Sequence, residues 1–350
     1  MTSMVNYKSK ELETMKVIKD ILMGLVVLYH SMLCSAGGDW GPEEAYNTSR
    51  ALYYISGYLN RIHIYAFTFV SGYIFSYLFF ETDRYSDFCI VIRKKIKRLI
   101  IPYISAMVLW VVPFYCFFWK PEAKILIKKF VLGTSPSQLW FLLMLFWQFV
   151  LFQALSSKIF EKKKTTIVWG IVFALCIYGG MILGRVGFPN FYQILTAMQY
   201  SLFFYFGMLF RRMNSARCVN GAVFLGGAVT SILLFAFIQY LYVTQSSIRV
   251  IGNLLYPVVS LTGVFSFIVG ILLMNDRFSI STMNLNFDAG MTVYLFHQQL
   301  IYTSICLFNK PWMPPVTFTA INFLVGLLGG ICIHNMLKKS KLMRALFGLD

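Results

Sequence analysis

The first long apolar segment of the sequence contains a cation, a carboxylate and an imidazole: Lys19, Asp20 and His30. A charge at the centre of a bilayer costs about 2.5–3.5 kcal/mol, so such residues suggest a function. Eleven residues make about three helical turns, so Lys19 and His30 would project from one face, roughly 16 Å apart along the axis. We expect both to line one cavity, with Lys19 at its mouth and His30 near the middle of the membrane. Alternatively, Lys19 extends to the membrane surface and His30 only bonds a neighbouring helix.

Two further histidines lie in or beside apolar segments. His63 stands at the edge of the second segment, shortly before Ser71 and Gly72, which allow close packing between helices. His297 lies well inside the ninth segment, and two glutamines follow it. Three consecutive polar side chains are unsuited to lipid, so we expect this run to face a polar interior. It would serve there either as substrate contacts or as hydrogen bonds between helices.

A run of cations precedes the third apolar segment, and a tryptophan opens the fourth. The cations set membrane orientation and attract anionic lipid headgroups, or they clamp a phosphate-bearing cofactor. The tryptophan, Trp140, suits the aromatic belt at a membrane surface and is also a candidate cavity residue. The cationic run consists of Arg93, Lys94, Lys95, Lys97 and Arg98.

Ten apolar segments must position these residues. Hydrophobic residues make up 58% of the 350 residues and charged residues 13%, and the mean hydropathy is +0.66. This composition excludes an ordinary soluble enzyme. A helix of about 20 residues crosses the hydrocarbon core of a membrane, so the ten apolar segments predict an all-α polytopic membrane protein. The expected spans are 18–36, 62–80, 99–119, 138–157, 166–184, 194–210, 219–243, 251–274, 291–308 and 317–337.

The basic residues are distributed unevenly between the loops. With ten spans, 22 of the 31 Lys and Arg residues fall on the side of the N-terminus. The positive-inside rule therefore predicts cytoplasmic N- and C-termini, and the net charge of +17 does not require nucleic acid as a partner. Asp20 and His30 favour a retained first helix over a cleaved signal peptide. The seven cysteines are scattered, so we expect no disulfide framework and no metal site.

Taken in order, these features resemble the integral-membrane acyltransferase 3 family. The first span is similar to its Arg/Lys-x10-His pattern, the second to its Phe-x-x-Ser-Gly-Tyr run, and the cationic run to its basic loop before Leu-x-x-Pro-Tyr. The resemblance covers residues 16–337 and implies a single membrane acyltransferase domain within 1–350. The matching stretches are Lys19 to His30, residues 61–73, 95–103, 139–142 and 293–297.

Two positions depart from the family pattern. Met23 stands where the Asp-x-x-Arg/Lys-Gly run has a cation, so Lys19 takes that role only from one helical turn earlier. Lys95 replaces the first arginine of the basic loop and lacks the planar, two-pronged guanidinium. Neither change affects His30.

The resemblance implies an O-acyltransferase in the cell membrane that moves an acyl group, usually acetyl, from cytoplasmic acetyl-CoA to a glycan or lipid-linked sugar. His30 would remove the proton of the sugar hydroxyl or carry the acyl group, and His63 would assist at the acceptor. The other site residues implied are Lys19, Arg93, Lys95 and Arg98 for the CoA anion, and Asp20, Trp140 and His297 for the cavity. The length of the acyl group (acetyl, succinyl or longer), the particular glycan and hydroxyl, and the oligomeric state stay open. The alternative is a transporter or flippase of a lipid-linked saccharide.

Overall fold

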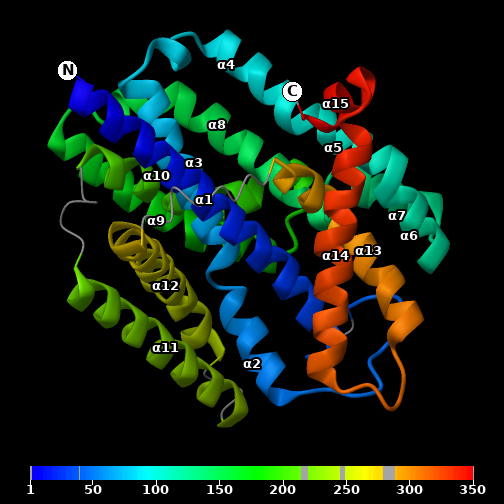
Figure 1. Cartoon of the computed structure of the whole chain (residues 1–350). Helices are drawn as coiled ribbons and strands as arrows, with labels where there is room; N and C mark the ends of the chain where they lie inside the picture. The colour runs from blue at the N-terminus through cyan, green and yellow to red at the C-terminus, as the bar shows by residue number, and fades with distance from the viewer. Residues whose placement is uncertain (1, 39, 214–219, 245–248, 279–287, 350) are drawn as a thin grey trace. The chain divides into compact units, whose positions relative to one another are not determined.

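The computed structural model of the protein describes residues 2–38, 40–213, 220–244, 249–278 and 288–349 (Figure 1). Within these ranges the regular elements are helices and no strand occurs, which confirms the all-α prediction. The α-helices are α1 (Thr2–Leu33), α2 (Arg50–Leu59), α3 (His63–Phe80), α4 (Phe88–Lys95), α5 (Ile101–Ala106), α6 (Val112–Trp119), α7 (Ala123–Leu126), α8 (Trp140–Ile159), α9 (Lys163–Arg185), α10 (Ile194–Arg212), α11 (Gly221–Thr244), α12 (Arg249–Phe278), α13 (Gly290–Phe308), α14 (Pro315–Leu337) and α15 (Lys341–Phe347).

Seven helical stretches in the described ranges are long and apolar enough to cross a membrane. Each of the ten predicted spans overlaps a helix, but those in α1, α10 and α13 are not among the seven. These three helices are more polar: α1 carries Lys16, Lys19 and Asp20 within its last 18 residues, and α13 carries His297 with its glutamines. The count of ten and the cytoplasmic termini therefore stay predictions.

The stretch that contains α4, α5 and α6 is helical throughout but contains two π turns, Ile96–Ile100 and Met107–Val111. A proline ring clashes with the carbonyl four residues earlier in an α-helix. The carbonyls concerned belong to Arg98 for Pro102 and to Leu109 for Pro113, and both lie within the π turns. Widening the helix at these carbonyls keeps it continuous through both prolines.

The chain forms two compact units, each assembled from separate stretches of the sequence. The first comprises Met1–Leu22, Gly57–Asp83 and Tyr200–Asn286, and the second comprises Met23–Ser56, Arg84–Gln199 and Phe287–Asp350. A single acyltransferase domain over residues 1–350 stays a prediction.

In the first unit, glycines bring α3 and α10 into close backbone contact. A Cβ atom at Gly72 would overlap the carbonyl oxygen of Phe204, and one at Gly207 would overlap that of Phe69. The hydroxyl of Ser76 in α3 donates to the Met208 carbonyl at 3.3 Å. Gly72 therefore does have the packing role that its position predicted. Helices α11 and α12 also lie side by side in this unit (Figure 1).

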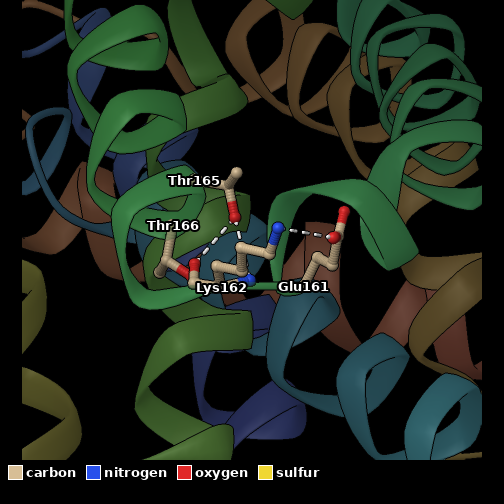
Figure 2. Close-up of polar contacts among 4 residues, drawn as sticks. All are labelled: Glu161, Lys162, Thr165 and Thr166. Atoms are coloured by element: carbon tan, nitrogen blue, oxygen red, sulfur yellow. Dashed lines mark hydrogen bonds and ion pairs between the residues drawn. The ribbon is translucent and has the colours of Figure 1, made fainter.

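The second unit holds α8, α9, α13 and α14. Helix α9 begins just after the short turn that follows α8, where threonine side chains satisfy the first backbone groups. The Lys162 N–H donates to Thr165 Oγ1 at 3.0 Å, and the Thr166 hydroxyl donates to the Lys162 carbonyl at 3.1 Å (Figure 2). The exposed Lys162–Glu161 ion pair at 3.4 Å contributes little because water screens it (Figure 2). Helices α13 and α14 pack against each other along their lengths.

Candidate active site

The second unit brings two of the predicted histidines into contact. The Nε2 atom of His297 lies 3.1 Å from Nδ1 of His30, and the ring centroids are 4.9 Å apart. His30 belongs to the last turn of α1 and His297 to the middle of α13, so 267 residues separate them in sequence. His297 is fully buried and His30 is partly exposed. The run around His297 therefore faces the interior of its unit.

Backbone carbonyls determine where the protons of this pair lie. A carbonyl oxygen only accepts, and Nδ1 of His297 lies 2.9 Å from the carbonyls of both Val293 and Tyr294. Nδ1 of His297 therefore carries the proton, and its Nε2 accepts. Nδ1 of His30 lies 3.0 Å from the Val26 carbonyl as well as 3.1 Å from His297, so it donates. In this arrangement the lone pair of neutral His30 is on Nε2.

A network of three glutamines holds α13 to the start of α8. The side-chain amide of Gln138 donates to the Leu295 carbonyl at 2.8 Å and to Gln299 Oε1 at 2.7 Å. Gln298 Oε1 accepts from the backbone N–H of Gln138 at 3.0 Å. All three glutamines are buried. The two glutamines that follow His297 thus act as contacts between segments and fix the helix that carries it. Gln138 is a residue that sequence reasoning did not single out.

A group of aromatic rings begins beside His30. The Trp40 ring lies 5.5 Å from the His30 ring and 4.9 Å from the Tyr302 ring, and Trp119 lies 5.2 Å from Tyr302. Sequence reasoning missed these three residues because tryptophan and tyrosine are common in this chain and their spacing carries no signal.

The predicted cationic residues divide into two groups. Arg93, Lys94, Lys97 and Arg98 are exposed, as an anion site requires. Lys95 is instead half-buried, with its ammonium 3.5 Å from the Phe149 ring centroid and 5.1 Å from that of Tyr85. Burial raises the pKa of the Tyr85 phenol, and the charge of Arg98 acts in the opposite direction. Arg98 is therefore near Tyr85. Because the Lys95 ammonium lies against two rings, Lys95 serves at least in part to pack against aromatic side chains.

The remaining predicted residues lie elsewhere in the chain. Lys19 and Asp20 belong to α1 within the first unit, where the Lys19 ammonium lies 5.9 Å from the Phe67 ring. His63 is also in the first unit, is buried, and donates from Nδ1 to the Leu59 carbonyl at 2.6 Å. Trp140 is the first residue of α8 in the second unit, and its ring contacts Phe141. The roles predicted for these four residues stay predictions.

Comparison with known families gives the chain its class. Residues 13–334 match the family model for the acyltransferase domain of the acyltransferase 3 family. The chain belongs to this family and is a membrane acyltransferase. Comparison with curated proteins and with solved structures gives no match.

Proposed function

We propose that the protein is an O-acetyltransferase of the cell membrane that transfers acetyl from cytoplasmic acetyl-CoA to a hydroxyl of a glycan or lipid-linked sugar. The observation that carries this proposal is the hydrogen bond between His30 and His297 inside an acyltransferase domain. A neutral imidazole with a defined tautomer is suited to general-base catalysis near neutral pH.

The proposed reaction proceeds by direct transfer. Nε2 of His30 accepts the proton of the sugar hydroxyl as its oxygen attacks the thioester carbonyl. A carbon–oxygen bond forms, the carbon–sulfur bond breaks, and the CoA sulfur leaves with the proton that His30 returns to it. His30 is the catalytic residue in this scheme. His297 is a positioning residue, because it touches neither substrate and acts through the Nδ1 proton of His30.

The donor side of the proposal rests on charge. Arg93, Lys97 and Arg98 are exposed cations at the start of one long helical stretch, where they can bind the phosphates of CoA. Lys95 contributes charge nearby, although its ammonium lies against aromatic rings. Membrane lipids with anionic headgroups would be attracted to the same run.

The experiment measures transfer of radiolabelled acetyl from acetyl-CoA to the surface glycan extracted from cells that lack the protein. We expect H30A to lower kcat by roughly 10²–10⁴-fold, the usual contribution of a general base. H334Q is the matched control, because His334 is another buried imidazole of the second unit, bonded at 3.1 Å to Thr292. Full transfer by folded H30A would contradict the proposal. Movement of a lipid-linked sugar without acetyl transfer by the wild type would favour the transporter alternative.

A further inference from the structure

We infer that Trp40 and Trp119 form the acceptor subsite and that a sugar ring of the acceptor stacks on them beside His30, while the buried Tyr302 ring packs against both tryptophans and holds them in place. This inference rests on the proposed function and names the binding site for one of its two substrates. The three rings form a continuous series that starts at the base: His30 to Trp40 at 5.5 Å, Trp40 to Tyr302 at 4.9 Å, and Tyr302 to Trp119 at 5.2 Å.

Residues 44–47, a few positions after Trp40 in the loop that follows α1, are hydrogen-bonded to the segment after α13. The side chain of Asn309, just beyond α13, donates to the Glu44 carbonyl at 2.7 Å and accepts from the Tyr46 N–H at 3.2 Å. Asn47 in the loop donates to the carbonyls of Pro311 and Met313 at 2.7 and 3.1 Å. Side-chain amides at both ends of this contact thus fasten the loop to the segment after α13. Such anchoring suits a preformed binding surface.

The aromatic group lies at the opposite end of its helices from the cations. Trp110 in the second π turn contacts Phe296 at 4.9 Å, and nine residues later Trp119 at the end of α6 contacts Tyr302. The helical stretch that ends in α6 therefore runs in the same direction as α13. Arg98 precedes Trp119 by 21 residues, which corresponds to roughly 30 Å along the helical stretch. His297 lies between the two α13 contacts. Along these helices the order is therefore cations, histidine pair, aromatic rings.

This order separates the two substrates. An anionic donor bound at the cations reaches the histidine pair from one end, and the aromatic rings line the approach from the other end. Aromatic faces provide a flat apolar surface for the carbon–hydrogen face of a sugar ring, and they leave its hydroxyls at the edges. A hydroxyl at the ring edge can then meet Nε2 of His30. We assign the aromatic end to the saccharide acceptor on this basis.

The test compares W40A, W40F and W169A, using the unacylated glycan extracted from cells that lack the protein as the probe. We expect W40A to raise the acceptor KM roughly 3- to 10-fold, the range of a single aromatic stacking contact. The KM for acetyl-CoA should change less than twofold. W40F keeps an aromatic face and should recover most of the acceptor affinity. Trp169 in α9 is the matched control, since it is also a half-buried tryptophan of the second unit, but its ring contacts Phe173.

Direct glycan binding, followed by tryptophan fluorescence without acetyl-CoA, separates failure of this inference from failure of the proposed function. Glycan binding that W40A weakens, together with no acetyl transfer by the wild type, would support the subsite and contradict the transferase. Acetyl transfer with equal acceptor KM in the wild type and folded W40A would overturn the subsite. Absence of glycan binding to the wild type would overturn it as well.

Discussion

Replacing His297 by alanine separates the roles assigned to the two imidazoles. In the wild-type protein, Nε2 of His297 accepts the Nδ1 proton of His30 over 3.1 Å. When His30 takes the proton of the acceptor hydroxyl, this neutral hydrogen bond becomes charge-assisted. H297A removes the bond, leaves Nε2 of His30 present, and touches neither substrate.

The size of the effect follows from the change in that hydrogen bond. A bond to a charged group contributes about 1.5–3 kcal/mol and a neutral one about 0.5–1.5 kcal/mol. Only the difference, roughly 1–1.5 kcal/mol, stabilises the transition state relative to the ground state. Without His297, the proton of neutral His30 can also lie on Nε2, and that tautomer has no Nε2 lone pair to accept the substrate proton. This lowers kcat further, as loss of the orienting residue does in catalytic triads. We expect kcat to fall roughly 10- to 100-fold, with both KM values changing less than twofold.

The assay combines kinetics with a direct view of the protons. Initial rates and thermal unfolding are measured for the wild type, H297A and H297Q, whose amide oxygen can replace Nε2 as acceptor. We expect H297Q to retain more activity than H297A. Because the chain has four histidines, ¹⁵N-histidine NMR with single variants can assign each imidazole. In the wild type the proton of neutral His30 should be on Nδ1.

Three results would refute this reasoning. The first is a folded H297A protein whose kcat stays within twofold of the wild type. The second is an NMR spectrum with the proton of His30 on Nε2. The third concerns the double variant, because residues that act as one unit are not additive. A double variant H30A/H297A much slower than H30A would show that His297 acts independently of His30.

Two further predictions test the packing of the first unit and the donor site. G207A should lower the free energy of unfolding of the detergent-solubilised protein by about 1–3 kcal/mol, and with it the melting temperature, because its Cβ would overlap the carbonyl of Phe69. G226A in α11 is the control, since nothing lies within 4 Å of its added Cβ, and equal melting temperatures for the two variants would contradict the close contact. R98A should raise the KM for acetyl-CoA, and this effect should shrink at high salt because the residue is exposed. K95A should mainly lower the melting temperature; a larger KM effect for K95A than for R98A would reverse the roles we assign to these cations.

Much of the fold was predictable because it depends on local properties. Apolar runs of about 20 residues predicted ten helical segments, and each overlaps a helix. The three segments that are less suited to lipid are those whose polar residues interrupt the apolar pattern, as in α13 around His297. The π turns before Pro102 and Pro113 were not foreseen, since proline usually ends or kinks a helix.

The candidate site was predictable only in part. His30 and His297 were chosen as polar groups in apolar segments, a criterion that works because burying a polar group has a cost. The same criterion could not choose Trp40, since an aromatic residue in this chain needs no special explanation. Lys95 shows the opposite failure: its charge suggested an anion site, but Phe149, 54 residues further on, provides an aromatic face for its ammonium.

The sequence by itself determined that the chain is an all-α membrane protein, which family it resembles, and which histidines could do chemistry. These properties depend on hydropathy, charge and motif spacing along the chain. Only the tertiary structure decided that His30 pairs with His297, that carbonyls of α1 and α13 fix the tautomer, and that Trp40 stands beside the base. A hydrogen bond requires two atoms within about 3 Å at a defined angle. Residue spacing does not encode that geometry when the partners come from segments 267 residues apart.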